Sequence, residues 1–427
     1  MPVKTILRTN SGSWMALPLM VLAVAFAMGY MPATGDGYPI AIASSAMISL
    51  VFVAPICGAL GAWEAARFRR ALWWGLPHAR PQLVIALFAV GPVILAGSIA
   101  GIAAMSAKLV AEGYFGLGLI PDLRLVVVTV AVIASHAMVG FAIGLWVPIV
   151  VAAPGVLIAS FIWMAFSAAT EPLWLRHLNG SLATCCLVQY DLAPNAVGAA
   201  LVFAIGLMLG AAILIVQERA RPGRSAIAIV PFAAASLVAA SLAGSLGPDP
   251  VVARDETGLV CAGEPGSVEV CVWPEHATRL DETVGIAVRA IHSWKKARIE
   301  APSRLTEGKG GDGKGLSFGL SLGSTEADII GSLAYALLPG MPECAATGPY
   351  PAAEIRDELY AWYASLAGMS DEELDSRLGS RDGSGRGPRG TVAVLRQRSA
   401  EVQVTWVRGA IAAVSSCDDV AFDIPGQ

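Results

Sequence analysis

The sequence predicts an α-helical membrane protein that carries a C-terminal α+β domain held by disulfides. Hydrophobic residues make up 55% of the 427 residues, charged residues only 15%, and the mean hydropathy is +0.62. Soluble proteins are about 25% charged. Long uncharged runs fill the first 247 residues, whereas most charges and four of the seven cysteines follow them. These observations predict an integral membrane part joined to a water-soluble part.

The two parts differ in the sign of their charge. Residues 1–248 contain 12 Lys and Arg against 7 Asp and Glu, a net charge of +5. Residues 249–427 contain 17 against 26, a net charge of −9. Neither balance points to nucleic acid as a partner, because nucleic-acid binding calls for a strongly basic surface.

We expect six crossing helices in residues 1–217, a cytoplasmic loop with a seventh crossing in 218–247, and a soluble domain in 248–427. Each uncharged run is long enough for the hydrocarbon core of a bilayer, which takes about 20 helical residues. The runs are 9–35, 37–63, 81–107, 125–170, 192–217 and 225–247.

Two runs need comment. The first follows Lys4 and Arg8 and could be a signal peptide, but no small-x-small cleavage site stands out and a second apolar run follows at once. The run 125–170 has 46 residues. As one helix it would be about 69 Å long, roughly twice the core, so we expect two helices. Pro148, Pro154 and Gly155 mark the expected turn.

The positive-inside rule predicts a cytoplasmic N-terminus in the cell membrane. With that orientation, nine Lys and Arg residues lie in inner loops and three in outer loops. The inner ones are Lys4, Arg8, Arg67, Arg69, Arg70, Arg80, Arg219, Arg221 and Arg224. The outer ones are Lys108, Arg124 and Arg176, with Lys108 and Arg124 in a loop after the third run. Seven crossings then place residues 248–427 outside the cell.

The most distinctive stretch of the membrane part is 58–82, a charged elbow between the second and third runs. It contains Glu64, Arg67, Arg69, Arg70 and Arg80, with Trp63, Trp73 and Trp74 between them. A helix would place Glu64 and Arg67 on one face. Pro77 is expected to end this helix, and Pro81 to begin the next element. Arginines with interfacial aromatics are typical of a cytoplasmic connection between membrane helices.

A membrane helix that runs into E-x-x-R-x-R-R, then proline and a basic residue before the next helix, resembles the loop between helices 2 and 3 of ABC-2 type transporter permeases. The resemblance covers roughly the first 220 residues by helix count and loop placement. It implies that elbow 64–80 is a coupling segment that docks on a separate ATPase subunit. The seventh helix and the C-terminal domain depart from the family pattern.

The resemblance also implies partners and cofactors. Two permease copies, as a homodimer or related heterodimer, would form the pathway in membrane lipid, and two ATPase subunits would drive it. ATP and Mg would bind the partner, because this chain has no G-x-x-x-x-G-K-[ST] phosphate loop. We therefore expect no cofactor in this chain. The 23 arginines against 6 lysines indicate a high-GC bacterium such as an actinomycete.

Residues 249–427 predict one small α+β domain. The stretch 258–273 is typical of a β-hairpin that turns at Pro265 and Gly266. Helical periodicity covers 279–298, 325–338, 352–366 and 391–415. The stretches 306–315 and 379–390 are Gly-rich and charged, which predicts mobile loops.

Six of the seven cysteines fall on the predicted outer side, in agreement with an oxidising compartment. The four domain cysteines allow three pairings. We prefer Cys261–Cys271 across the hairpin and Cys344–Cys417. Zinc is the other use for these cysteines, but no C-x-x-C is present and the histidines are not clustered, so no metal is expected. For the adjacent Cys185 and Cys186, a bond to a partner chain and free thiols both stay open.

No catalytic motif is evident. The expected helix 327–338 contains no histidine, so it is not an H-E-x-x-H metalloprotease helix, and no G-x-S-x-G occurs. A non-catalytic lid over the membrane part or a binding module is the favoured role for the domain. In the membrane part, His136 is the one ionisable side chain expected at mid-membrane and is a candidate for the transport pathway. A neutral histidine bonded to a neighbouring helix is the more common case.

The favoured function is the permease subunit of an ABC exporter for a lipid-like or hydrophobic peptide substrate, because the expected helices offer an apolar path. One rival is a surface receptor or enzyme whose helices only anchor the outer domain, which would not need a basic, aromatic elbow. The other is an ion-coupled transporter, which would show charged residues or broken helices at mid-membrane.

Overall fold

The computed structural model describes residues 8–30, 37–71, 80–216, 227–263, 268–308, 315–343, 345, 350–378 and 388–417. The chain forms two compact units that divide between Ala253 and Arg254. We call them the membrane unit and the C-terminal unit, and describe each by itself.

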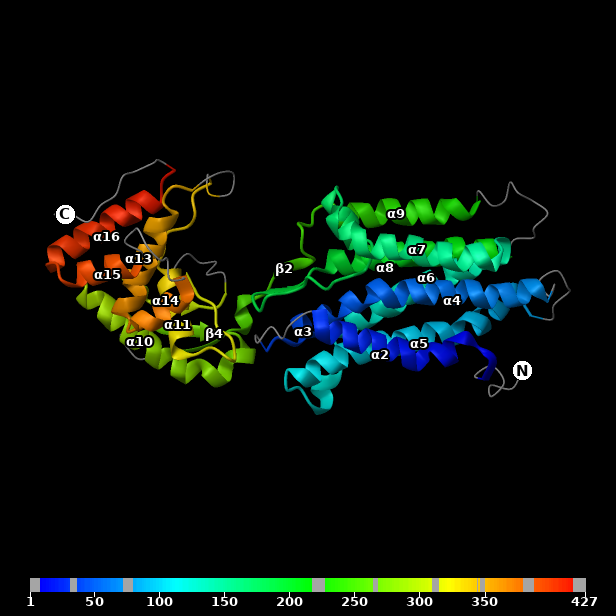
Figure 1. Ribbon diagram of the computed structural model, residues 1–427, viewed down its shortest axis with the longest axis horizontal. Helices are drawn as coiled ribbons and strands as arrows, with labels where there is room; N and C mark the ends of the chain where they lie inside the picture. Colours follow the sequence, from blue (N-terminus) through cyan, green and yellow to red (C-terminus); the bar gives the residue numbers. More distant parts are fainter. Residues whose placement is uncertain are drawn as a thin grey trace. The chain divides into compact units, whose positions relative to one another are not determined.

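The membrane unit is a bundle of long apolar helices (Figure 1). Within the described residues, six helices are long and apolar enough to cross a membrane, so the chain is a multi-pass membrane protein. These spans are α2 (Ser11–Tyr30), the continuous segment Pro39–Arg70, α5 (Gln82–Ala111), α6 (Leu123–Trp146), α7 with its 3₁₀ extension (Ile149–Ala169) and α8 (Pro194–Val216). The second span combines α3 (Pro39–Ser45), the 3₁₀ turn Ala46–Ser49 and α4 (Leu50–Arg70).

The centre of the bundle is the crossing of α4 and α6, where glycines let the two backbones touch. A Cβ atom on Gly140 would overlap the carbonyl oxygen of Gly58, and one on Gly61 would overlap that of Ala137. A Cβ on Gly144 would lie 2.5 Å from the carbonyl oxygen of Ala62. Small residues at such spacing are the usual means of close helix packing in membranes, where lipid supplies no hydrophobic drive for association.

The long run 125–170 does form two helices, but the turn is simpler than expected. Helix α6 ends at Trp146, and Pro148 caps α7. Pro154 and Gly155 lie inside α7 rather than at the turn, which corrects the sequence expectation. Proline is tolerated within membrane helices because neighbouring groups satisfy the backbone that it frees.

One further expectation for the membrane unit needs correction. Lys108 lies in the last turn of α5 rather than in a loop, and it is buried. The seventh run 225–247 contains α9 (Ile229–Ala243), whose 15 described residues make it shorter than the six spans, and a seventh crossing stays a prediction. Helix α9 packs along α8 (Figure 1). The expected cytoplasmic loop with Arg219, Arg221 and Arg224 lies outside the described residues.

The chain leaves the membrane unit at the same end of the bundle at which α8 begins. Strand β1 (Tyr190–Leu192) comes directly before α8, and β2 (Val251–Ala253) follows α9. The two strands pair antiparallel, with Leu192 opposite Val251. The end of the segment 171–191 and the last residues of the membrane unit, 251–253, therefore meet at one end of the bundle.

The C-terminal unit combines a four-stranded sheet with helices, as expected for an α+β domain. The sheet order is β3-β4-β5-β6. Strands β3 (Val260–Gly263) and β4 (Glu269–Val272) form the expected antiparallel hairpin, while its turn at Pro265 and Gly266 lies outside the described residues. The short parallel strands β5 (Arg304–Thr306) and β6 (Leu316–Ser317) were not expected.

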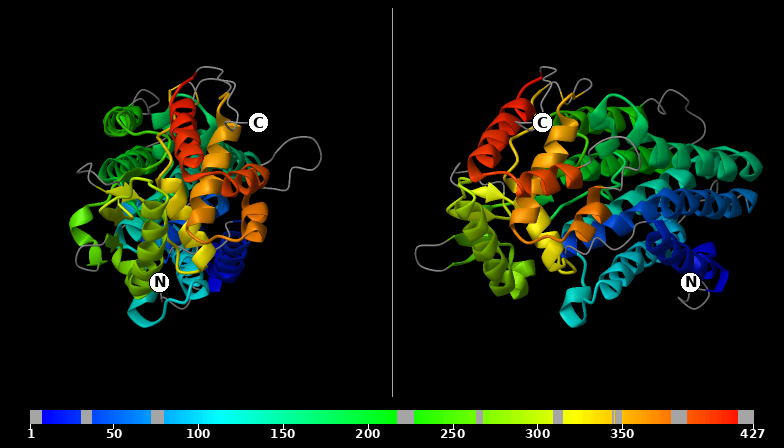
Figure 2. Two further views of the ribbon diagram at one scale, coloured as in Figure 1. Left: turned by 90° about the vertical axis from the view of Figure 1, so that its left-hand side faces the viewer. Right: turned by 60° about the vertical axis from the view of Figure 1, so that its left-hand side comes forward.

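Three of the expected helices are present as α10 (Leu280–Lys296), α11 (Glu326–Ala336) and α13 (Ala353–Leu366). The fourth, 391–415, is in fact two helices, α15 (Pro388–Arg396) and α16 (Ala400–Val414), and α14 (Asp371–Leu378) was missed. Helices α13, α14, α15 and α16, which are orange to red in Figure 2, pack together. Four fully buried tryptophans fill the core: Trp273, Trp294, Trp362 and Trp406. Much of the two expected Gly-rich loops lies outside the described residues.

Candidate functional site

The charged elbow begins within α4, and its first residue has a structural partner. Glu64 is buried, with 2% of its surface exposed. One carboxylate oxygen accepts a hydrogen bond from the backbone N–H of Ser11, at 2.7 Å, and the other pairs with Arg67 at 3.0 Å. Arg67 also donates to the carbonyl oxygen of Thr9 at 2.7 Å. Glu64 thus joins the end of α4 to the beginning of α2, where an anion is favoured by the helix dipole.

The start of α2 is held by a second side chain. Asn10 accepts from the N–H of Gly12 at 2.9 Å and donates to the carbonyl oxygen of Ala89 on α5 at 2.7 Å. Helices α2, α4 and α5 are therefore fastened to one another at the end of the bundle where the elbow begins. We call the contacts of Glu64, Arg67 and Asn10 the helix clamp.

The other elbow residues present positive charge at the same end. Arg67, Arg70 and Arg80 are exposed, and Arg69 is half-buried. Arg80 lies over the ring of Phe88 at 5.7 Å, at the beginning of α5. Trp73, Trp74 and Pro77 lie outside the described residues. The structure thus gives Glu64 and Arg67 a role within the bundle and leaves Arg70 and Arg80 exposed.

His136 lies on α6 next to the glycine crossing and is buried, with 7% exposed. Its Nδ1 lies 2.8 Å from the carbonyl oxygen of Val132, one turn earlier in the same helix. The expected bond to a neighbouring helix is therefore replaced by a bond within α6. This contact satisfies one ring nitrogen, and the role of His136 in a pathway stays a prediction.

The opposite end of the bundle is covered by the segment 171–191. Arg124, at the start of α6, pairs with both Asp122 and Asp191, each at 3.0 Å. His177 lies 2.9 Å from the carbonyl oxygen of Gly247, and burial lowers the pKa of His177. These contacts tie the segment to the start of α6 and the end of α9.

Cys185 and Cys186 are joined to each other by a disulfide and are both buried. This pairing corrects the sequence analysis, which considered only a partner chain or free thiols. Ser44 donates to the carbonyl oxygen of Cys185 at 2.6 Å, so the pair is anchored to α3. Cys57 is a buried free cysteine, as its position in a membrane helix suggested.

The other disulfides lie in the C-terminal unit. Cys261 and Cys271 are opposite each other on β3 and β4 and are bonded, which confirms the preferred pairing. Cys417 is also disulfide-bonded, whereas Cys344 lies outside the described residues, so that pairing stays a prediction. Among the described residues, the one group with metal-ligand spacing is Cys261, Glu269 and Cys271. Its two sulfurs are already joined in the disulfide and do not provide thiolate ligands.

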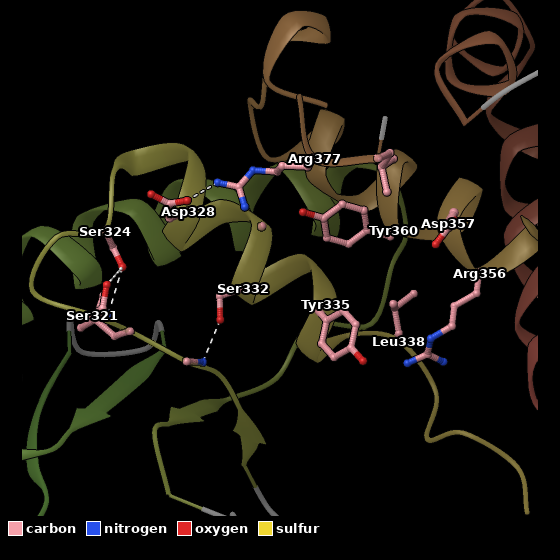
Figure 3. Close-up of a pocket in the computed structure, with 14 residues that line it drawn as sticks. Ser321, Ser324, Asp328, Ser332, Tyr335, Leu338, Arg356, Asp357, Tyr360 and Arg377 are labelled. Atoms are coloured by element: carbon pink, nitrogen blue, oxygen red, sulfur yellow. Dashed lines mark hydrogen bonds and ion pairs between the residues drawn. The ribbon is translucent and has the colours of Figure 1, made fainter. Parts of the chain in front are cut away.

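A cavity of about 600 Å³ lies between α11, α13, α14 and the segment 319–324 that connects β6 to α11 (Figure 3). This size is typical of small-molecule sites. Two arginines line it, Arg356 on α13 and Arg377 on α14, and two tyrosines, Tyr335 and Tyr360, lie between them (Figure 3). Burial raises the pKa of Tyr360, so its hydroxyl stays protonated and able to donate.

At one end of the cavity, Arg377 is already neutralised. It forms an ion pair with Asp328 and bonds to Tyr360. Asp328 in turn accepts from the N–H and the hydroxyl of Thr325, both at 2.7 Å, as part of the capping box that begins α11. Hydrogen bonds from Thr325, with that from Arg377, lower the pKa of Asp328 to about 2. This end of the cavity is a fixed polar wall.

A buried contact between a histidine and a glutamate lies beside the sheet. Nδ1 of His276 lies 2.8 Å from one carboxylate oxygen of Glu307, and both side chains are at most 1% exposed. The other oxygen of Glu307 accepts from the backbone N–H of Trp273 at 2.8 Å. Since both groups are enclosed, they serve the packing of the 3₁₀ turn after β4 against the end of β5. The sequence showed only that the histidines are not clustered, and nothing in it indicated that Glu307 is the partner of His276.

Residues 270–417, roughly a third of the chain, match the family described as "Domain of unknown function (DUF7224)". The match starts in β4 and covers nearly all of the C-terminal unit. The membrane unit has no match to an ABC-2 permease family. No curated protein and no solved structure matches the chain.

Proposed function

We propose that the chain is the membrane subunit of an ABC-2 type exporter, driven by a separate ATPase subunit that binds ATP and Mg. Two copies of each subunit would form the complex. The substrate would be a lipid-like or hydrophobic peptide molecule. The N-terminus would be cytoplasmic and the C-terminal unit extracellular, as a lid or a binding module without catalysis.

The observation that carries the proposal is the charged end of the second span. The segment Pro39–Arg70 has 32 residues and is about 48 Å long, well beyond the roughly 30 Å core. Its last turns therefore extend past the hydrocarbon and hold Arg67, Arg69 and Arg70 in a rigid helix. A separate subunit that binds there would act directly on α4.

Through the helix clamp and the glycine crossing, a movement of the end of α4 would be transmitted to the other helices of the bundle. Glu64 fastens the end of α4 to α2, and Asn10 fastens the start of α2 to α5. The same helix α4 touches α6 at Gly58 and Gly61. A displacement of the end of α4 would thus be passed to α2, α5 and α6 together, because packed helices move as units.

The structure changes the substrate argument in one respect. Lys108 lies inside α5 rather than in a loop, but in the last turn of that helix. Apart from the buried thiol of Cys57, the middle of the described spans keeps only His136 as an ionisable side chain. An apolar route between the helices still favours a hydrophobic or amphipathic substrate over an ion.

The test begins with isolation of the tagged full-length chain from its native membrane. We expect a subunit with an ATP-binding phosphate loop to copurify, and ATP hydrolysis by the complex in lipid nanodiscs. Replacement of Arg67, Arg69 and Arg70 by glutamate should dissociate the complex or abolish stimulation of hydrolysis. Normal copurification and normal transport by this triple variant would refute the proposed contact. Leu237→Ala, on the exposed face of α9, is the matched control.

A second function, that of a surface receptor, is favoured by one observation, the cavity in the C-terminal unit. A receptor would bind its ligand there without ATP hydrolysis and without a nucleotide-binding partner. The same isolation experiment separates the two functions, because only the exporter requires the ATPase subunit. A chain truncated after Gln217 should lose transport if the C-terminal unit acts as a lid or receives the substrate.

A further inference from the structure

The cavity between α11, α13 and α14 is lined by Arg356 and by the neighbouring acidic residue Asp357. Arg356 is buried, with 8% of its surface exposed, and it lines the cavity. One of its N–H groups donates to the carbonyl oxygen of Pro339 at 2.7 Å. Its guanidinium lies 5.5 Å from the ring of Tyr335 (Figure 3). Among the residues that the structure describes, no carboxylate forms an ion pair with it.

The guanidinium of Arg356 has donors left for a ligand. A guanidinium has five N–H donors, of which the carbonyl of Pro339 takes one. The carbonyl and the ring of Tyr335 both attract the cation, but neither carries a full negative charge. Arg356 is well suited to a bound anion because a guanidinium matches the geometry of a carboxylate.

The other arginine of the cavity does not compete for that anion. Arg377 is held by Asp328 and Tyr360 and is already neutralised. Four charged side chains line the cavity: Asp328, Arg356, Asp357 and Arg377. Of the two arginines, Arg377 is paired with Asp328, whereas Arg356 forms no ion pair with a described carboxylate, including the neighbouring Asp357 (Figure 3). Between these two arginines, the cavity is lined by the rings of Tyr335 and Tyr360 and by the side chain of Leu338 (Figure 3). Such a wall suits an apolar or aromatic body rather than a second charge.

We propose that this cavity binds a small organic carboxylate with an apolar or aromatic body. The carboxylate pairs with Arg356, and the body lies against the rings of Tyr335 and Tyr360. The volume of about 600 Å³ leaves room for a ligand of more than ten non-hydrogen atoms. Tyr335 is 57% exposed and lies at the mouth, so the ligand enters past its ring. This proposal rests on the binding role given above to the C-terminal unit and does not depend on transport.

The test uses ligand-observed saturation-transfer NMR on the full-length chain in nanodiscs, without the ATPase. The probes are 3-phenylpropionate and its neutral amide, 3-phenylpropionamide, which differ only in the charged group. We expect saturation transfer to the acid and at least tenfold weaker binding of the amide. Equal binding of both would overturn the role of Arg356. Displacement of the acid by inorganic phosphate at the same concentration would overturn the need for an apolar body.

Variants locate the binding in this cavity. Arg356→Gln should weaken binding of 3-phenylpropionate at least tenfold. Tyr335→Ala removes a mostly exposed ring and so leaves the fold intact, and it should weaken binding about fivefold. Arg408→Gln, an exposed arginine on α16, should bind as the parent does. Unchanged binding in Tyr335→Ala together with Arg356→Gln would overturn the proposal. Because no step uses ATP, loss of transport coupling would leave these results unaffected.

Discussion

The helix clamp predicts a large difference between Glu64→Ala and Arg70→Ala. Glu64 is 2% exposed and accepts a charge-assisted hydrogen bond from Ser11, whereas Arg70 is exposed and has no contact in the clamp. Loss of a hydrogen bond to a buried charged group costs about 1.5–3 kcal/mol. The ion pair with Arg67 adds at most about 1 kcal/mol, because the side chain of Arg67 is 45% exposed and is screened by solvent.

We therefore expect Glu64→Ala to lower the free energy of unfolding by about 2–4 kcal/mol, and Arg70→Ala to change it by less than about 0.5 kcal/mol. Arg67→Ala should lie between them, near 1 kcal/mol, because Glu64 keeps its bond to Ser11. The assay is equilibrium unfolding of the full chain in mixed micelles by titration with sodium dodecyl sulfate, followed by tryptophan fluorescence. A Glu64→Ala protein as stable as the parent would refute the clamp.

Three further outcomes follow from the structure. Gly140→Leu should destabilise the membrane unit by at least about 1–3 kcal/mol in the same titration, because its Cβ would overlap the carbonyl of Gly58, whereas Gly155→Leu, with open space around it, should not. Mass spectrometry of non-reduced peptides should show Cys261 bonded to Cys271 and Cys185 bonded to Cys186; free thiols at either pair would contradict the structure. The pKa of Asp328 is depressed to about 2 by Thr325 and Arg377, so its contribution to stability is present above pH 3.8 and is lost as the pH falls toward 2. Asp328→Asn should therefore lose less stability than the parent between pH 4 and pH 2, and an identical loss would show that the bonds are not formed.

The sequence was informative wherever one physical property dominates a long stretch. Uncharged runs of membrane length located the six spans, since hydrocarbon excludes charged side chains. The hairpin was predictable because its strands are adjacent in sequence and carry both cysteines. The position of Pro154 inside α7 could not be predicted in the same way, because proline within a membrane helix does not mark a turn as it does in a soluble protein.

Contacts between distant residues could not be predicted. The clamp joins Glu64 to Ser11 across 53 residues, and nothing in E-x-x-R-x-R-R indicates that its glutamate is buried. The cavity is built from α11, α13 and α14, and α14 itself was missed because its eight residues are mostly polar. The run 391–415 keeps helical periodicity across the break between α15 and α16, so the period alone did not show the end of a helix.

The most direct test of the central claim is site-specific photo-crosslinking in intact cells. A benzoylphenylalanine placed at Arg70 extends from the end of α4, where the ATPase subunit is proposed to bind. We predict a covalent adduct between this position and a subunit with an ATP-binding phosphate loop, and no such adduct from the exposed position Leu237 on α9. Adducts with lipid or solvent alone at Arg70, and again at Arg80, would contradict the account.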